Sequence, residues 1–379
     1  MQLSVIILNY NVRYFLELCV LSVQKAVQNL DAEIIVIDNN SSDDSCAMMK
    51  QRFQNIKLIE NNDNFGFPKG NNIAVAAAKG EYICILNPDT VVAEDTFEKV
   101  LAFAKSKTEL GIVGCKLIDG TGNFLLESKR GIPTPWVAIT KIFGLYKIFP
   151  NISSFNKYYA QHLDENQTGK VDILVGAFMV MKRDLYNELG GFDENCFMYS
   201  DDIDLSYRSL QKGKSNYYFH ETTVIHYKGE STVRDKNYIK HFRKAMQFFY
   251  NKHFRKSIVF DFVMKCGSFI FSVVKKNQQK NRIFSIDETI LFTKGSSSTF
   301  ASSVDIIYSR FDDFRINSTI SCEIIFDTTC FTYKEIISFM EKSKSVTVTF
   351  KNFLPSSNVV IGSNHANDIG QVLNLSKLE

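Results

Sequence analysis

The chain has 379 residues, of which 45% are hydrophobic, 22% charged and 13% aromatic. This much apolar side chain can offset the entropy of ordering the backbone, so the composition excludes a mainly disordered protein, and the length predicts about two or three domains. The net charge of +3 is too balanced for a nucleic-acid-binding protein. Residues 234–282 depart from this balance, with 13 Lys and Arg against two Asp.

The eight cysteines give no sign of a metal site or of disulfides. They form no Cys-x-x-Cys pair and no close cluster, which predicts reduced thiols. Residues 1–4 lack the basic start of a secretory signal, and the apolar run 258–274 contains Asp261 and Lys265, which argues against a membrane-spanning helix. We therefore expect a cytoplasmic protein, with the basic segment as the candidate contact with the inner face of the cell membrane.

The first 120 residues alternate short β-rich runs with helical segments. Strands are predicted at 3–8, 33–37, 57–59 and 82–86. The third strand is followed by a Gly/Asn loop and then by an alanine-rich helix around 74–78. Near-continuous apolar strands that alternate with helices indicate a parallel α/β sheet covered on both faces. Such sheets bind ligands outside the carboxyl ends of their strands, and polar clusters occupy three of these ends, at 9–11, 38–42 and 87–89.

The remainder of the chain predicts a mixed region, a basic helical segment and a small C-terminal α/β unit. Before residue 283, strands are predicted at 112–117, 171–181, 217–219 and 223–226, and helices at 183–189, 201–211 and 238–250. Beyond it, a strand, a helix and two strands are predicted at 319–326, 332–342, 345–350 and 359–361. The domain boundaries that follow are 1–235, 236–282 and 283–379.

The residues at the strand ends exclude two common nucleotide sites. No Gly-x-Gly-x-x-Gly follows the first strand and no Gly-x-x-x-x-Gly-Lys-Ser/Thr occurs, which argues against a dinucleotide-binding Rossmann site and against a P-loop. The residues present suit a nucleotide that carries a diphosphate. Asp38 can accept hydrogen bonds from a base or ribose, Tyr10 can stack on a base, and Asp89 is a hard oxygen ligand for Mg²⁺ or Mn²⁺.

Each of these residues also has an ordinary structural interpretation. Asp38 could cap the next helix, although Ser41 and Ser42 are the more usual caps. Residues 87–90 could form a plain turn, and the glycines of the stretch 64–72 could only punctuate a loop. Their shared position at one edge of a predicted sheet favours a site.

A second polar cluster lies at the start of a predicted helix. Asp201, Asp202 and Asp204 place three acids within four positions, and like charges this close can raise a pKa, which suits a general base. The alternative is structural, since acids are favourable in a first helical turn and Asp204 can pair with Arg208. His226 ends a strand before a glycine turn, so it is either a structural residue or a metal ligand.

Taken in order, these motifs resemble those of the family 2, GT-A-fold inverting glycosyltransferases, particularly the rhamnosyltransferase-like branch. The resemblance runs from residue 3 to about 250, roughly two-thirds of the chain. It implies a mostly parallel nucleotide-binding sheet flanked by helices. The matching stretches are 5–11 (VIILNYN), 36–41 (VIDNNS), 64–67 (NFGF), 70–72 (GNN), 86–90 (LNPDT), 176–178 (GAF), 190–194 (GGFDE), 198–205 (MYSDDIDL) and His226 with Gly229 and Ser231.

The resemblance implies a role for each part of the site. Asp38 would contact the nucleotide base, Asp89 and His226 would hold Mg²⁺ or Mn²⁺ on the donor diphosphate, and Asp202 would be the general base. The other nucleotide-binding residues implied are Asn9, Tyr10, Asn11, Asn40, Gly66, Lys69, Asn71 and Asn87. The acceptor-side residues implied are Gly176, Ala177, Tyr199 and Arg208.

The chain departs from the family pattern in three places. The usual Asp-x-Asp is Asn87-Pro88-Asp89 here, a variant familiar in the rhamnosyltransferase-like branch, so one carboxylate is missing. The usual Glu-Asp pair is Asp201-Asp202, which leaves open which acid is the base. Small residues are usual where Pro68-Lys69 stands, which predicts that Lys69 touches a phosphate.

The implied activity is the inverting transfer of a sugar, with rhamnose as one candidate, from a nucleoside diphosphate to a glycan or lipid-linked glycan. The alternative is a catalytically silent nucleotide-sugar-binding or scaffold protein. A nucleotidyltransferase of the same fold would carry a basic, glycine-rich signature near its N-terminus, and residues 9–11 do not provide one.

Two segments remain without an assigned chemistry. The basic segment 236–282 is either a solvated helix face or an interfacial segment on an anionic membrane surface. Residues 283–379 contain no catalytic constellation. They are expected to serve as a scaffold, as a homodimer surface or as a partner-docking module.

Overall fold

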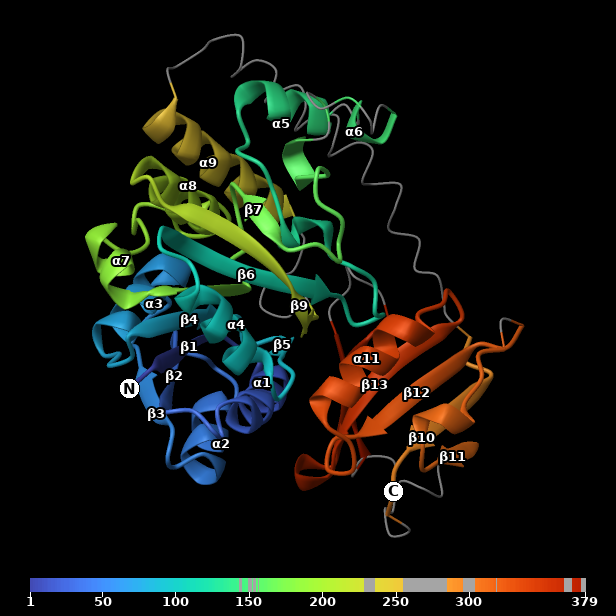
Figure 1. Cartoon of the computed structure of the whole chain (residues 1–379). Coiled ribbons are helices and arrows are strands. Elements are labelled where there is room, and N and C mark those ends of the chain that lie inside the picture. The colour runs from blue at the N-terminus through green and yellow to red at the C-terminus, as the bar shows by residue number, and fades with distance from the viewer. Residues whose placement is uncertain are drawn as a thin grey trace.

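The computed structural model contains two α/β units that pack against each other (Figure 1). It describes residues 1–142, 145–148, 152, 155, 157–227, 236–254, 285–295, 304–317, 319–364 and 370–375. Gly229, Ser231, the apolar run 258–274 and the predicted domain boundary at 282/283 lie outside the described residues, as does most of the basic segment. The predicted boundary at 235/236 falls where the described range 236–254 begins.

The N-terminal unit is built on a nine-stranded sheet with the order β3-β2-β1-β4-β8-β6-β9-β5, and β7 pairs with β9. Its strands are β1 (Leu3–Asn9), β2 (Ala32–Asp38), β3 (Lys57–Glu60), β4 (Tyr82–Leu86), β5 (Thr90–Val91), β6 (Leu110–Ile118), β7 (Gly169–Val171), β8 (Phe178–Lys182) and β9 (Ser215–His226). Strands β5, β7 and β8 run against the others. The predicted mostly parallel sheet is thereby confirmed.

Helices cover both faces of this sheet, because successive strand side chains point to opposite faces and both sets are apolar. One face packs on α1 (Arg13–Ala26), α2 (Ser45–Arg52) and α4 (Thr96–Lys105). The other packs on α3 (Gly66–Ala76), α7 (Arg183–Glu188) and α8 (Asp201–Gln211). Strands β1 and β2 are in parallel register from Leu3↔Ala32 to Asn9↔Asp38, so the polar residues after them meet at one edge.

Three expectations about these elements need correction. The run 171–181 is not one strand, because residues 172–177 separate β7 from β8. The predicted strands 217–219 and 223–226 are one strand, β9. Its pairing with β6 shifts register between Phe219 and Thr223, so the strand continues through the residues between the two predicted parts. The Gly/Asn stretch is largely helix, since α3 begins at Gly66 and takes Pro68 in its first turn, where proline is tolerated.

A further group of helices gathers at one end of the N-terminal unit (Figure 1). It comprises α5 (Pro135–Ile142), α6 (Leu145–Ile148) and α9 (Lys236–His253), and α9 covers the helix predicted at 238–250. Tyr250 of α9 donates its hydroxyl to the carbonyl of Pro133. No helix within the described ranges is long and apolar enough to cross a membrane.

The C-terminal unit is a six-stranded sheet with the order β11-β10-β12-β13-β14-β15. Pairings from β11 to β13 are parallel, and those of β14 are antiparallel. Its elements are β10 (Glu288–Phe292), β11 (Ile306–Tyr308), β12 (Cys322–Asp327), α11 (Tyr333–Ser343), β13 (Val348–Leu354), β14 (Val359–Ser363) and β15 (Gln371–Asn374). Thr332 and Glu335 form a capping box that starts α11. The expected small α/β unit is confirmed.

The two units share a hydrophobic core. Buried side chains of α1, β5 and β9, among them Phe15, Val91 and Ile225, form one cluster with Phe326, Ile336 and other side chains of the C-terminal sheet and α11. Arg52 of α2 bonds to Ser356 and Ser357 at a second contact. The C-terminal unit therefore lies directly against the N-terminal sheet.

Candidate active site

The ends of β1 and β2 form one hydrogen-bonded unit. Asn9 Nδ2 donates to Asp38 Oδ1 at 2.7 Å, and Ser41 donates to the same carboxylate through its amide at 2.7 Å and its hydroxyl at 2.6 Å. Asp38 is only 2% exposed. It is not a helix cap, and neither is Ser41, because the residue that precedes α2 in the cap position is Asp44.

Three of the predicted site residues adopt the left-handed backbone conformation, which is uncommon outside glycine and is often retained at functional sites. The φ angles of Asn11, Asn40 and Tyr199 are 56°, 59° and 77°. Asn11 and Asn40 are exposed next to the Asp38 unit, and Tyr10 is half-buried beside them. These side chains lie where the sequence predicts the nucleotide.

The start of α3 connects the end of β2 to the segment that precedes α8. Asn39 Nδ2 donates to the carbonyl of Gly66 at 3.0 Å, and the Phe67 amide donates to the carbonyl of Phe197 at 3.2 Å. Gly66 has a φ of +80°, and a Cβ there would lie 2.9 Å from the Phe197 carbonyl oxygen. Only glycine fits this close approach.

Two other predicted nucleotide residues belong to α3. Asn71 is fully buried and donates to the Phe67 carbonyl one turn earlier at 2.9 Å. Lys69 lies over the ring of Phe65, with 4.3 Å from its Nζ to the ring centroid. Asn71 is buried and supports the first turn of α3, and the contact of Lys69 with a phosphate stays a prediction.

The turn after β4 meets the end of β9. Asp89 is 4% exposed and His226 is 7% exposed, and 3.4 Å separates Asp89 Oδ1 from His226 Nε2. Asn87 Nδ2 lies 3.3 Å from the same ring nitrogen. Residues 87–90 do form a turn, because the Thr90 hydroxyl donates to the Asn87 carbonyl at 2.8 Å. That turn also brings Asp89 against His226.

This pair fits a divalent metal that a substrate would complete. In the part of the chain that the structure describes, no group of three or more His, Cys, Asp or Glu side chains could hold a metal alone. Mg²⁺, however, commonly takes one or two protein ligands and completes its shell with phosphate oxygens and water. Asp89 Oδ1, Asn87 Oδ1 and His226 Nδ1 are buried without a hydrogen-bond partner among the described residues, which is unusual for buried polar atoms.

Asp202 is held by an ion pair that the sequence did not predict. Its Oδ2 accepts from Arg130 Nη2 at 2.6 Å and from the Gly176 amide at 3.1 Å, and its Oδ1 accepts from the Ile203 amide at 2.7 Å. Burial alone would lower the pKa of Arg130, but the Asp202 carboxylate raises it. The Asp202 carboxylate therefore has one fixed orientation.

Asp201 experiences a different environment from Asp202. Burial, together with the charge of Asp202, raises the pKa of Asp201 to about 7. One acid is thus bound to an arginine while its neighbour is partly protonated near neutral pH. Adjacent carboxyls that lie in such different environments are typical of acid–base sites.

Replacing Asp201 with asparagine should remove a pH-dependent loss of stability. Because its pKa is raised from 3.8 to about 7, the folded protein keeps a proton that the unfolded chain releases, so stability falls as the pH rises through this window and is constant above it. Between about pH 4 and pH 7, the wild type should lose on the order of a few kcal/mol more than Asp201→Asn. Urea unfolding at several pH values measures this difference, and parallel curves would contradict the assignment.

Gly176 and Ala177, which come just before β8, connect the Asp202 carboxylate to the turn that follows β4. The Gly176 amide binds Asp202, and the carbonyl of the next residue, Ala177, accepts from the Asn87 amide at 3.0 Å. A Cβ on Gly176 would lie 3.4 Å from the Asp202 Cβ. Gly176 and Ala177 therefore lie at the junction between Asp202 at the start of α8 and the Asp89–His226 pair.

Arg208 and Asp204 belong to a separate network. Arg208 donates to Asp204 at 2.7 Å, to the Gly191 carbonyl at 2.8 Å and to the Leu189 carbonyl. Burial opposes the charge on Asp204, but His253, Arg208 and Lys252 lower its pKa to about 2. Arg208 thus fixes the loop before α8, and we assign it no contact with an acceptor.

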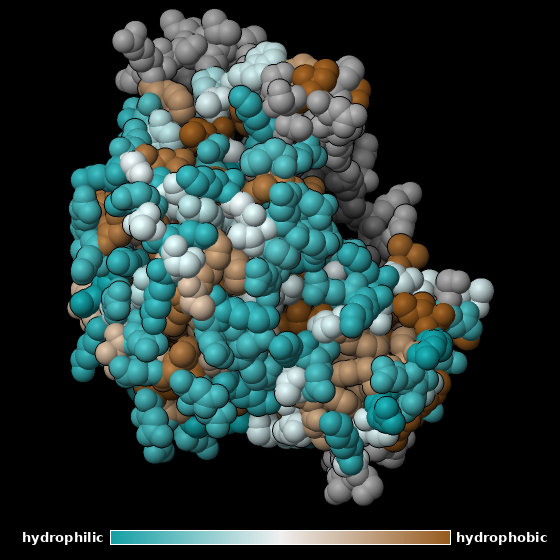
Figure 2. Space-filling view, viewed as in Figure 1, coloured by the Kyte–Doolittle hydropathy of each residue, from teal (hydrophilic) through white to brown (hydrophobic). Residues whose placement is uncertain are grey.

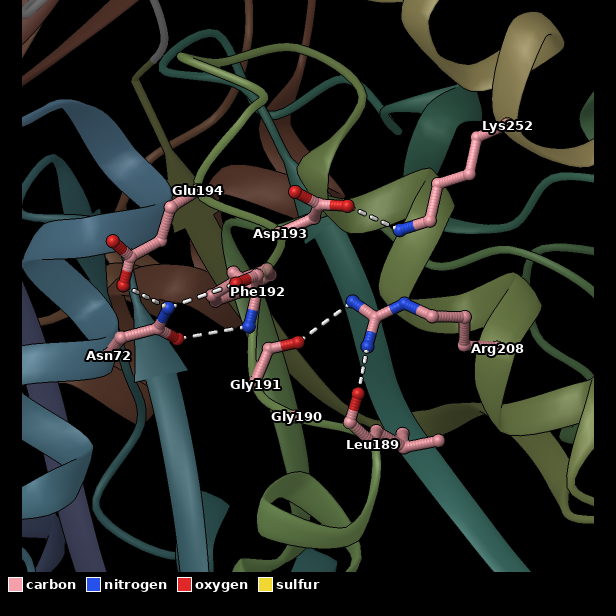
Figure 3. A pocket seen from close by; sticks show the side chains of 9 residues that line it. All are labelled: Asn72, Leu189, Gly190, Gly191, Phe192, Asp193, Glu194, Arg208 and Lys252. Atoms are coloured by element: carbon pink, nitrogen blue, oxygen red, sulfur yellow. Dashed lines mark hydrogen bonds and ion pairs between the residues drawn. The ribbon is translucent and has the colours of Figure 1, made fainter.

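A pocket of about 350 Å³ lies at this network (Figure 3). Figure 3 shows that Arg208 bonds to two loop carbonyls and that Lys252 bonds to Asp193. The polar groups that line the pocket therefore largely bind one another. The lining residues are Asn72, Leu189, Gly190, Gly191, Phe192, Asp193, Glu194, Arg208 and Lys252. Asp38, Asp89, Asp202 and His226 do not line it, so this pocket is not the predicted active site.

Two residues of the site were missed from the sequence. Arg130 lies in an irregular stretch 72 residues from its partner Asp202, and no motif or periodicity marks it. Asn39 joins the end of β2 to α3, and its position within the matched stretch 36–41 was the only available signal.

The arrangement defines a class of protein fold, the α/β fold of the GT-A type. Over 65% of this chain and 48% of the other, the structure is similar to GalNAc-T7 crystallised with UDP, GalNAc and Mn²⁺, with a TM-score of 0.50 and 17% sequence identity. At this identity the likeness shows the fold alone.

Residues 4–190 match the family Glycosyl transferase family 2. The chain is 25% identical over 244 residues to N-acetylglucosaminyl-diphospho-decaprenol L-rhamnosyltransferase of Mycobacterium tuberculosis, covering 62% of this chain and 78% of the relative. It is 28% identical over 221 residues to rhamnosyltransferase WbbL of Escherichia coli K12, covering 54% and 78%. The N-terminal unit therefore carries a family 2 glycosyltransferase domain, and the chain is similar to rhamnosyltransferases, as its motifs indicated.

Proposed function

We propose that this protein is an inverting glycosyltransferase that moves a sugar from a nucleoside diphosphate to a glycan acceptor with the help of a divalent metal. The observation that carries the proposal is the Gly176-Ala177 junction, which brings the Asp202 carboxylate to the same sheet edge as Asp89 and His226. Rhamnose is the first sugar to test, because the two relatives named above are rhamnosyltransferases.

The donor nucleotide is proposed to lie along the ends of β1 and β2. A carboxylate offers about four acceptor positions, and Asp38 uses three of them for Asn9 and Ser41. The Cys46 thiol also lies against this carboxylate, so the polar groups that remain for the base are those of Asn11 and Asn40, which are exposed beside it. The diphosphate is then directed toward Asn87 and Asp89.

Each residue of the proposed site has a chemical task. Asp89 and His226 would hold Mg²⁺ or Mn²⁺, and the bound metal would supply a Lewis acid for the charge that grows on the leaving diphosphate. Asp202 takes the proton of the acceptor hydroxyl as that oxygen attacks the anomeric carbon and the bond to the β-phosphate breaks. Arg130 and the Gly176 amide hold the carboxylate in place, and attack opposite the leaving group inverts the anomeric centre.

A thermal-shift screen tests the proposal. UDP-, GDP- and dTDP-sugars are each added to the full chain with MgCl₂, with MnCl₂ or with EDTA. We expect one nucleotide to raise Tm in the presence of metal, and the corresponding sugar to be transferred or slowly hydrolysed. A shift without any turnover would indicate a silent nucleotide-sugar-binding protein, and no shift with any donor would overturn the proposal.

We further propose that the acceptor is lipid-linked and that the chain binds an anionic membrane surface through α5 and α6. Trp136, Ile148 and Ile152 are 51%, 64% and 44% exposed, and Figure 2 shows hydrophobic surface at this end of the molecule. The basic segment begins in α9, which packs on the same region through Tyr250. Apolar anchors combined with cations suit an anionic interface.

Trp136 reports on this binding directly, because it is the only tryptophan in the chain. Vesicles of phosphatidylglycerol should shift its emission to shorter wavelength, since the exposed ring would leave water. Vesicles of phosphatidylcholine should give a smaller shift, and Ile148→Glu should weaken the effect. An emission maximum that no vesicle changes would remove the membrane proposal.

A further inference from the structure

The two proposed metal ligands depend on a very short strand pair. Asp89 directly precedes β5, which has two residues, and His226 is the last residue of β9. The pair is joined by the register Thr90↔His226 and by the Tyr227 amide, which donates to the Asp89 carbonyl at 3.0 Å. So short a ladder cannot fix the distance between the two ligands without support from its surroundings.

The C-terminal unit contacts this ladder at Tyr227. Asn352 of β13 donates its Nδ2 to the Tyr227 hydroxyl at 2.6 Å, and both residues are 1% exposed. The Tyr227 ring also packs edge-on against Phe15, with 5.1 Å between ring centroids. A Cβ on Gly120 would lie 2.9 Å from the same ring, so the ring is enclosed on several sides and its position is well determined.

A second contact lies just beyond β5. Both carboxylate oxygens of Glu94 accept backbone amides from the first turn of α11, from Tyr333 at 2.8 Å and from Lys334 at 2.9 Å. The Lys334 ammonium lies 2.7 Å from Asp95. The first amides of a helix have no partner inside it, and a carboxylate there is favourable. The start of α11 is therefore anchored on the segment that follows β5.

From these contacts we infer that the C-terminal unit, residues 283–379, positions Asp89 and His226 by supporting both strands of the β5–β9 ladder, with Asn352 and the Tyr227 hydroxyl as the positioning pair. The inference rests on the proposed function for the identity of the metal site. Asn352 and the apolar side chains of α11 are buried, so these side chains are not available to a second copy or another partner.

The test uses Tyr227→Phe, Asn352→Leu and the double variant in the full chain. Ser356→Ala is the matched control, because it removes a different hydrogen bond between the two units, the one to Arg52. Hydrogen–deuterium exchange of peptides that cover residues 85–92 and 222–227 reports on the ladder without any donor. Titration of MnCl₂ in the presence of UDP, GDP and dTDP reports on the metal, with nucleotide binding in EDTA as the reference.

We expect both single variants to speed exchange in the two peptides and to raise the MnCl₂ concentration for half-saturation about tenfold, the usual scale for outer contacts of metal ligands. Binding in EDTA and the Ser356→Ala control should change little, whereas Tm should fall in both single variants because each leaves a buried polar group unpaired. The exchange of the double variant should resemble that of either single one. If hydrogen–deuterium exchange in the two peptides is as slow in both single variants as in the wild type, the inference is overturned even if the donor screen succeeds. If the screen finds no donor, faster exchange would still support the positioning role while the metal assignment fails.

Discussion

Asp202→Asn should reduce sugar transfer by about 10²–10⁴-fold, the range that general-base catalysis contributes. The amide can still accept the Gly176 hydrogen bond that the carboxylate now accepts at 3.1 Å, but it cannot take a proton from the acceptor hydroxyl. Binding of the donor nucleotide should be retained, because Asp38 and Asp89 are untouched. Initial rates of transfer and calorimetric titration of the nucleotide measure the two effects separately.

The same substitution at Asp201 is the matched control, since both acids lie in the first turn of α8. Asp201→Asn should retain measurable transfer, because only Asp202 contacts the Gly176 amide at the junction with the metal pair. Full activity in Asp202→Asn, together with loss in Asp201→Asn, would assign the base to Asp201.

Asp89→Asn should abolish the stimulation of transfer by Mg²⁺ or Mn²⁺ and lower the metal-dependent rate by at least about 10²-fold, because a neutral amide is a poor ligand for a hard divalent cation. The buried site favours this outcome, since Asp89 is 4% exposed and His226 is the nearest candidate second ligand at 3.4 Å. EDTA should have the same effect on the wild type, and rates against MnCl₂ concentration measure it.

Glu98→Gln is the comparison for this substitution, because Glu98 is an exposed acid of α4 outside the site. It should follow the wild-type metal curve. A wild-type enzyme that transfers sugar equally well in EDTA would contradict the metal assignment, and Asp89 would then be a residue of the turn alone.

The parts of the fold that follow local patterns could be predicted from the sequence. Strands β1, β2 and β4 are buried along almost their whole length, so their apolar runs and the polar residues that end them were visible. The start of α3 was not, because Gly66 and Pro68 are usual loop residues. Proline is nevertheless tolerated in a first helical turn, and the positive φ of Gly66 admits the Phe197 carbonyl.

The interactions that connect distant segments could not be predicted. The three acids of α8 form one cluster in the sequence, yet in the structure Asp202 pairs with Arg130 and Asp204 pairs with Arg208 and Lys252. Which partner each acid meets depends on packing, and the pairing of Asp202 with Arg130 spans 72 residues. For the same reason the contact of Asn352 with Tyr227 has no sequence signal.

A crystal structure of the full chain with MnCl₂ and the donor found by thermal shift tests the central assignment most directly. We expect one anomalous manganese peak between Asp89 and His226, the diphosphate on that ion, the base beside Asp38 and the anomeric carbon facing Asp202. A manganese ion bound elsewhere, or a donor seated in the pocket around Arg208 and Lys252, would contradict the account.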